Sequence, residues 1–291
     1  MRNLVASLPV CVLVLLSGSP ASASECPHDP DALGVSRVLE IDTSGGPRFG
    51  TLQYKQTLDL DPKEVVLTFD DGPHIRNTKR VLAALQWECV KATFFTVGTM
   101  VQYNPETLQA IAAEGHTIGA HSWSHPRNLG RMASARAASQ IERGFRAINA
   151  AVATQIAPFF RFPGLNDSNS LNAYAAGRGY AIFSTDVSSD DWRGISANTI
   201  VRRTMARLNQ KQGGIILFHD TKNATAAAIP ALLQALKKGG YKIVHIVPER
   251  SYGSVKSADA RSEVGEETTI VKLASSTKNL SGKKAAAAAN P

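Results

Sequence analysis

The chain has 291 residues, of which 43% are hydrophobic, and it carries a formal net charge of +8 at pH 7. This length suits one large domain or two small ones, and the hydrophobic content is ordinary for a globular protein. The Lys and Arg residues are scattered and form no dense basic stripe interleaved with aromatic residues. The composition therefore gives nucleic-acid binding little support, while attraction to an anionic polymer or a cell surface stays open.

The first 23 residues have the pattern of a secretory signal. Arg2 supplies a positive charge, residues 8–16 are almost wholly apolar, and Ala21-Ser22-Ala23 has the small-x-small form that precedes a cleavage site. The apolar run is short for a membrane span of about 20 residues, which argues against an anchor. We therefore expect residues 1–23 to be removed, and an exported, periplasmic or secreted protein without stable membrane insertion.

Two cysteines, Cys26 and Cys89, remain after such a cleavage, because Cys11 lies in the leader. An oxidising compartment would allow them to form a disulfide. Cys89 is equally suited to a small buried position at the start of a strand. The sequence leaves both alternatives open.

The C-terminal residues 250–291 differ in composition from the rest of the chain. Ser, Ala, Lys, Gly and Glu dominate, and no aromatic residue follows Tyr252. Such a segment cannot bury enough apolar area to offset the entropy of ordering it, so we expect a disordered low-complexity tail. Between leader and tail we expect an N-terminal extension at 24–60 and one folded domain at 61–249.

Short runs of β-branched and aromatic residues alternate with helical stretches across this domain. The expected strands lie at 64–69, 92–97, 116–120, 159–162, 180–184, 214–219 and 241–246. The expected helices lie at 77–85, 106–114, 134–153, 171–178, 197–208 and 226–238. Because strand–helix alternation is typical of a parallel sheet, about seven such units predict an α/β barrel or a strongly curved sheet.

Polar residues gather where the expected strands end. In chain order they are Asp70, Asp71, His121, His125, Arg161, the segment 186–192, His219 and Asp220. In a parallel barrel the carboxyl ends of all strands open on one face, where active sites lie. We therefore expect these side chains to converge on one site.

The segments "TFDDGP" and "HSWSH" together predict a metal site. Two imidazoles four residues apart, His121 and His125, with one carboxylate form a recurring ligand set for a divalent cation that leaves positions open for water. Two adjacent carboxylates repel each other, and a bound cation would compensate. One Asp would then hold the cation and the other would be free to act as a base. A plain strand-to-turn junction at Gly72-Pro73 is the alternative.

Five short segments resemble the motifs of the polysaccharide deacetylases, the carbohydrate esterase family 4 that includes chitooligosaccharide, peptidoglycan and chitin deacetylases. They are "TFDDGP", "HSWSH", "RFPG", "SSDDW" and "LFH", and they follow the family's order within about residues 60–247. The resemblance implies a distorted (β/α) barrel of about seven parallel strands in a single domain. It also implies a hydrolase that removes acetyl groups from sugars with a divalent metal, expected to be Zn²⁺, with Co²⁺, Ni²⁺ or Mn²⁺ as alternatives.

The resemblance also implies roles, position by position. Asp70 would be the catalytic base, which takes a proton as metal-bound water attacks the acetyl carbonyl. Asp71, His121 and His125 would be the metal ligands. His219 would be the acid that protonates the leaving amine.

Further positions match the walls of the family's site. Arg161 would orient the base, while Gly164, Asp191, Trp192 and Leu217 would surround the acetyl group. Gly164 stands where the family usually has Tyr or Phe, so a ring that could stack on a sugar is lost while the backbone N–H is kept.

A second departure concerns the partner of the catalytic His. Ser188 stands where the family usually has an Asp that tunes this His, and Asp186 or Asp191 would substitute for it.

We therefore expect an acetylated glycan as the partner and removal of N-acetyl groups from chitin-like or peptidoglycan chains. An O-acetyl polysaccharide esterase of the acetylxylan type would use the same site. A non-catalytic glycan-binding relative would be expected to have lost Asp70 or His219, and both are present. The oligomeric state stays open, and a monomer is compatible with the sequence.

Overall fold

The computed structural model describes residues 26–153 and 155–249. The predicted signal sequence at 1–23 and the predicted tail at 250–291 lie outside the described residues. Within them the chain forms a sheet of ten strands in which every pairing is parallel. The strands are β1 (Arg37–Ile41), β2 (Arg48–Phe49), β3 (Glu64–Asp70), β4 (Thr93–Thr96), β5 (Thr117–Ala120), β6 (Phe159–Phe160), β7 (Ala181–Phe183), β8 (Val187–Ser188), β9 (Gly214–His219) and β10 (Lys242–Pro248).

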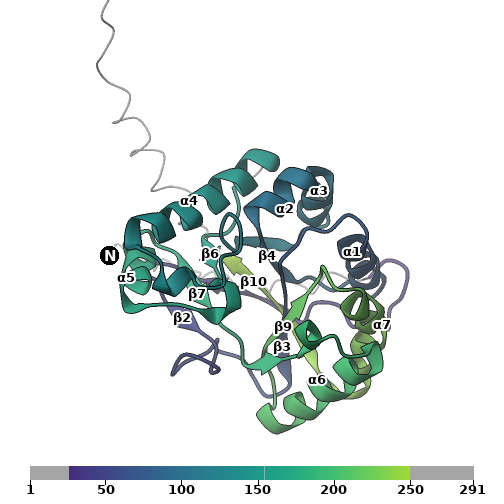
Figure 1. Cartoon of the computed structure of the whole chain (residues 1–291). Coiled ribbons are helices and arrows are strands. Elements are labelled where there is room, and N and C mark those ends of the chain that lie inside the picture. Colours follow the sequence, from purple (N-terminus) through teal and green to yellow (C-terminus); the bar gives the residue numbers. More distant parts are fainter. Residues whose placement is uncertain (1–25, 154, 250–291) are drawn as a thin grey trace, which may run out of the picture. The chain divides into compact units, whose positions relative to one another are not determined.

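The strands follow the order β1-β10-β3-β4-β5-β6-β7-β2, with β9 beside β3 and β8 beside β9. Helices lie around the outside of these strands (Figure 1). They are α1 (Asn77–Trp87), α2 (Gly98–Tyr103), α3 (Pro105–Ala113), α4 (Ser134–Ala151), α5 (Asn169–Gly177), α6 (Ala197–Lys211) and α7 (Asn223–Lys238). This arrangement confirms the predicted α/β fold and is consistent with a distorted barrel.

Local sequence signals explain where several helices begin and end. Ser196 caps α6 by accepting a hydrogen bond from the backbone N–H of Thr199, as its position before the helix predicts. The helix ends at Gln212, whose backbone is left-handed. Helix α7 begins at Asn223, three residues before the expected start at 226, so Thr225 lies inside it and its hydroxyl is free to donate to Asp191.

Strand β3 contributes side chains both to the outer core and to the interior of the barrel. Successive side chains of a strand point to opposite faces. Val65, Leu67 and Phe69 accordingly pack into the large apolar core that includes the helices, while Val66 packs into a second, smaller core. Asp70 shares the alternation of Val66, which places its carboxylate at the interior end of the strand.

The segment before residue 61 is part of the sheet. We expected an extension at 24–60, but β1 pairs with β10 and β2 pairs with β7. A disulfide joins Cys26 to Cys89 just beyond α1, which settles the alternative that the sequence left open. No helix in residues 26–153 and 155–249 is long and apolar enough to cross a membrane.

Candidate active site

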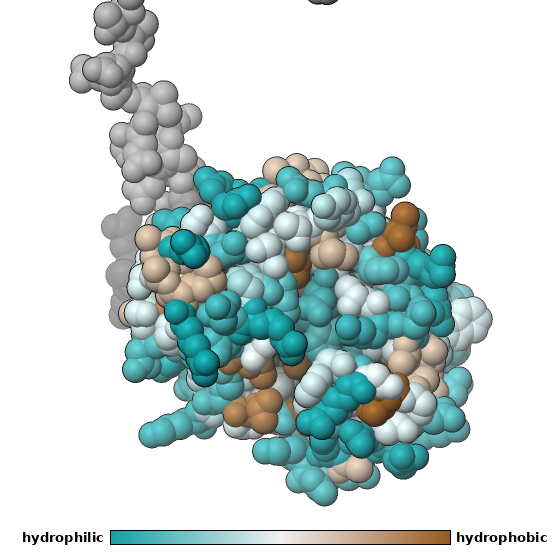
Figure 2. All heavy atoms as spheres, viewed as in Figure 1, coloured by the Kyte–Doolittle hydropathy of each residue, from teal (hydrophilic) through white to brown (hydrophobic). Residues whose placement is uncertain are grey.

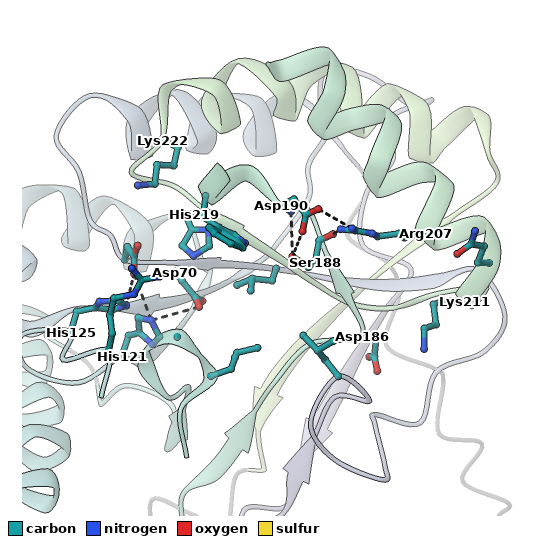
Figure 3. Close-up of a pocket in the computed structure, with 18 residues that line it drawn as sticks. Asp70, His121, His125, Asp186, Ser188, Asp190, Arg207, Lys211, His219 and Lys222 are labelled. Carbon is teal, nitrogen blue, oxygen red and sulfur yellow. Dashed lines mark hydrogen bonds and ion pairs between the residues drawn. The ribbon is translucent and has the colours of Figure 1, made fainter. Parts of the chain in front are cut away.

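A cavity of about 950 Å³ lies at the carboxyl ends of the central strands (Figure 3). The parallel register brings residues far apart in sequence to this end, because Asp70 at the end of β3 is paired with His219 at the end of β9. Ala120 and Phe160 are paired in β5 and β6, so the residues that follow them enter the same region. The predicted site residues that line the cavity are Asp70, Asp71, His121, His125, Gly164, Trp192, Leu217 and His219.

Three of these residues form a cluster that could hold a cation. Asp71 Oδ1 lies 3.2 Å from His125 Nε2 and 3.6 Å from His121 Nε2. One potential ligand atom from each residue lies within 4.8 Å of the others. The turns after β3 and β5 orient these side chains through left-handed backbone, with φ of 75° at Asp71, 68° at Ser122 and 54° at His125. Such conformations are unfavourable for residues other than glycine, so the surrounding fold must hold the ligands in place.

The chemistry of this cluster fits a divalent metal ion. Asp71 Oδ1 is buried and has no hydrogen-bond partner among the described residues, so a ligand acceptor is left unsatisfied. His121 Nδ1 donates to the backbone carbonyl of Arg161 at 2.7 Å, which leaves the Nε2 lone pair facing the cluster. Burial and the neighbouring His125 lower the pKa of His121 to about 3, so its imidazole is neutral and able to bind metal.

Asp70 occupies a different environment from its neighbour Asp71. The Arg161 guanidinium donates to Asp70 Oδ1 at 2.7 Å and to Thr68 Oγ1 at 2.8 Å. The same guanidinium donates to the carbonyls of Phe183 and Ser184, so it is fully buried yet well satisfied. Burial raises the pKa of Asp70, and the positive charge of Arg161 opposes this. Asp70 Oδ2 remains on the cluster side, 3.7 Å from His121 Nε2.

His219, which is paired with Asp70 across β9 and β3, is held by a buried carboxylate. Its Nδ1 lies 2.7 Å from Asp191 Oδ1, and its backbone N–H donates to Asp191 Oδ2. Thr225 Oγ1 also donates to Asp191 Oδ2. Burial alone would lower the pKa of His219, but Asp191, with Asp71 and Asp70, raises it to about 9. The imidazole is therefore protonated near neutral pH, and Nε2 is the nitrogen left for a substrate.

Of the two residues that the sequence leaves open as partners of His219, only one contacts it. Asp191 makes the contact, whereas Asp186 accepts hydrogen bonds from the 50–57 loop and from Ile215 N. Ser188 bonds to Asp190 instead. Asp191 is thus a buried support behind His219 and not itself part of the cavity wall.

Asp220 is a further buried carboxylate beside the site. Its Oδ2 accepts a hydrogen bond from Thr78 Oγ1, and a Cβ built on Gly72 would lie 2.3 Å from that same oxygen. Gly72 therefore has to be glycine for Asp220 to pack against the turn that carries Asp71. Burial raises the pKa of Asp220 to about 7.

Several cavity residues were not selected from the sequence. They are Leu52, Leu165, Arg127, Arg207, Gln210, Lys211 and Lys222. Most are ordinary loop or helix-end residues with no pattern that would have marked them. Leu52 lies in the segment 24–60, which the sequence predicts to be an extension outside the domain that carries the site.

Comparison with known proteins gives the family. The family described as Polysaccharide deacetylase matches residues 57–183. Over 201 residues the chain is 31% identical to the chitooligosaccharide deacetylase of Bradyrhizobium sp. (strain ANU 289), an alignment that covers 64% of this chain and 90% of the relative. The chain therefore belongs to the polysaccharide deacetylase family.

Two further relatives are peptidoglycan deacetylases. The chain is 33% identical over 199 residues to the peptidoglycan-N-acetylmuramic acid deacetylase PdaC of Bacillus subtilis, covering 67% of this chain and 40% of PdaC. It superimposes on the solved peptidoglycan deacetylase of Bdellovibrio bacteriovorus with a TM-score of 0.66 at 34% identity, covering 74% of this chain and 60% of the other. The chain spans about two fifths of the length of the first curated relatives it matches.

Proposed function

We propose that this protein is a divalent-metal-dependent hydrolase that removes N-acetyl groups from glycans containing N-acetylglucosamine, such as peptidoglycan or chitin-like oligomers. The observation that carries the proposal is the division between Asp70 and Asp71. Asp71 turns an unsatisfied oxygen toward two imidazoles, while Asp70 is held by Arg161. Two adjacent carboxylates in such different surroundings are suited to different tasks.

Asp71, His121 and His125 would hold the cation, which we take to be zinc, with cobalt, nickel or manganese able to occupy the same ligands. When bound, such an ion lowers the pKa of a coordinated water and polarises a carbonyl oxygen. Asp70 would accept a proton at Oδ2, because Oδ1 is bound to Arg161. Its raised pKa suits a base that must accept a proton near neutral pH.

His219 would deliver the proton that the leaving group needs. An amine leaves a tetrahedral centre readily only when it is protonated, and the raised pKa of His219 keeps a proton on its ring. Asp191 would fix the ring so that Nε2 carries that proton toward the cavity. Because an ester has less need of this acid, the protonated His219 favours N-acetyl substrates over O-acetyl ones.

The remaining wall residues would place the acetyl group. The backbone N–H of Gly164 is the donor that we assign to the developing oxyanion, and Trp192 and Leu217 would supply apolar contacts for the methyl group. The presence of both Asp70 and His219 argues for catalysis over glycan binding alone. The disulfide between Cys26 and Cys89 fits an oxidising compartment and thus an exported protein.

Acetate release tests the proposal. The full chain would be incubated with N-acetylglucosamine oligomers, purified peptidoglycan and acetylated xylan, each with a chelator and then with Zn²⁺, Co²⁺, Ni²⁺ or Mn²⁺ added back. We expect acetate from at least one N-acetylated glycan, loss of that activity with chelator and recovery with metal. Acetate from xylan alone would contradict the N-acetyl assignment, and release that survives chelation would contradict the metal assignment.

A further inference from the structure

The loop at residues 50–57 contributes one residue, Leu52, to the wall of the cavity. Leu52 lines the same cavity as the metal-ligand cluster, and its side chain is 59% exposed. The family match begins at residue 57, so this leucine lies before the region that the family defines. An apolar side chain facing a cavity of charged residues calls for a physical explanation.

One side of the loop is fixed by Asp186. Its Oδ1 accepts hydrogen bonds from the backbone N–H and the Oγ1 of Thr51, each at 2.8 Å. Its Oδ2 accepts from Thr57 Oγ1 at 2.6 Å and from the backbone N–H of Ile215 in β9 at 2.8 Å. Leu52 itself donates its backbone N–H to the carbonyl of Thr185. A single carboxylate thus ties both ends of the loop to the barrel.

The other side of the loop rests on the turn that contains Gly164. Gln53 Nε2 donates to the carbonyl of Leu165 at 2.5 Å, and Tyr54 donates its hydroxyl to Asp167 Oδ2 at 3.1 Å. With both sides bonded, Leu52 is presented from a fixed backbone. A ligand that contacts it would lose little affinity to ordering of the loop.

The wall next to this loop is open because residue 164 is a glycine. A Cβ built there would meet only the Arg127 carbonyl oxygen, at 3.9 Å. Other apolar groups line the same cavity, among them Leu165 and the half-exposed Trp192. The face viewed in Figure 2 is mostly hydrophilic, with hydrophobic groups in small patches. A charged centre with apolar groups on its wall suits a pyranose ring, which presents apolar C–H faces and a polar edge of hydroxyl groups.

The cavity is also larger than the hydrolysis of one acetyl group requires. Its volume of about 950 Å³ lies near the upper end of the roughly 300–1,000 Å³ that small-molecule sites occupy. There is room for a sugar ring in addition to the one that carries the scissile group.

We propose that Leu52, presented by the 50–57 loop, forms a sugar-binding subsite that packs against the C–H face of a second ring of the glycan chain. The nature of this occupant rests on the proposed function. A subsite for a second ring selects for oligomers over single sugars, because a monosaccharide has no second ring to fill it.

The test measures binding by the chelated full chain, so that turnover does not interfere. Calorimetry gives the Kd for N-acetylglucosamine and for its pentamer with wild type, Leu52→Ala, Leu52→Tyr and Lys55→Ala. Lys55 is the matched control, because it lies exposed on the same loop and does not line this cavity. We expect Leu52→Ala to weaken pentamer binding by roughly fivefold or more, the scale of a partly buried leucine, without changing the monomer. Leu52→Tyr should bind the pentamer at least as tightly as wild type, and Lys55→Ala should match wild type.

Equal pentamer affinity of wild type and Leu52→Ala would overturn the subsite, as would a wild type that does not bind the pentamer. The two proposals fail separately. Binding that depends on Leu52 in a protein that releases no acetate would sink the proposed function and keep the subsite. Acetate release together with pentamer binding that does not depend on Leu52 would support the proposed function and overturn the subsite.

Discussion

The two sides of the site differ in how completely the protein satisfies them. On the side of Asp70 and His219, Asp70 is bonded to Arg161, and Asp191 is bonded to His219 and Thr225. On the metal side, Asp71 Oδ1 has no hydrogen-bond partner among the described residues. The first side, the complete side, has its hydrogen-bond partners without a ligand. On the second, the incomplete side, a buried acceptor oxygen stays without a partner unless an added group binds it.

The difference arises over a single peptide bond. Asp70 is the last residue of β3, and its side chain follows the strand alternation into the interior. Asp71 has a φ of 75°, which turns the chain out of the strand and swings the next carboxylate toward the histidines. The contrast teaches that backbone conformation, more than residue type, places the two carboxylates in different surroundings.

Removing Arg161 from the complete side should have the largest effect on the free energy of unfolding. Arg161→Ala would leave the buried Asp70 carboxylate unpaired and remove three further hydrogen bonds, so we expect a loss of about 3–5 kcal/mol in the free energy of unfolding. Urea unfolding of the chelated protein measures it. Arg178→Ala is the control, because Arg178 is half exposed in its pair with Glu142 and should cost no more than about 1 kcal/mol. Equal losses of unfolding free energy in the two variants would show that the buried Arg161–Asp70 pair contributes no more to stability than the exposed pair.

Binding of a cation on the incomplete side should have the next largest effect on the stability of the folded chain. A cation that binds only the folded chain stabilises it by about 2.7 kcal/mol when its free concentration is 100 times its Kd. Thermal unfolding with and without Zn²⁺ should therefore show a higher Tm with metal. His125→Ala removes one ligand of the cluster and should abolish most of that rise. A rise that persists in His125→Ala would place the metal elsewhere.

Titration of His219 should have a smaller effect on stability. Its pKa of about 9 in the folded chain exceeds the usual value near 6.5, so the stabilisation is fully present below pH 6.5 and is lost as the pH rises through 9. We expect on the order of 2 kcal/mol after allowing for partial solvent screening. Unfolding of the chelated chain between pH 6.5 and 9.5 would be compared with His219→Gln. An unchanged slope in His219→Gln would refute the raised pKa.

The central fold was predictable because its strands and helices alternate with clear periodicity. The strands at 64–69 and 214–219 were placed within one residue of β3 and β9. Strands β1, β2 and β8 and the helix α2 were not predicted. The five-residue β1 lies in the segment that we expected to be an extension outside the domain. A two-residue strand such as β2 or β8 has too few positions to show alternation, and its existence depends on a partner distant in sequence.

The site was predictable as far as residue types reveal chemistry. Asp71, His121 and His125 lie together, as the spacing of the two histidines and the family resemblance of Asp71 indicated. The sequence did not choose between Asp186 and Asp191 as the partner of His219, because that choice depends on how the 186–192 segment turns back against β9. Leu52 could not be found either, since its place at the cavity follows from contacts with residues 112 to 135 positions away.

A paired measurement of bound metal and turnover in Asp70→Asn and Asp71→Asn tests most directly whether the two carboxylates have different roles. Both substitutions remove one charge while conserving shape. We predict that Asp70→Asn keeps about one equivalent of Zn²⁺ and loses acetate release by a factor on the order of 10² or more, whereas Asp71→Asn fails to retain the metal. Loss of metal from Asp70→Asn with retention in Asp71→Asn, or a wild-type rate in Asp70→Asn, would contradict the division between the two carboxylates.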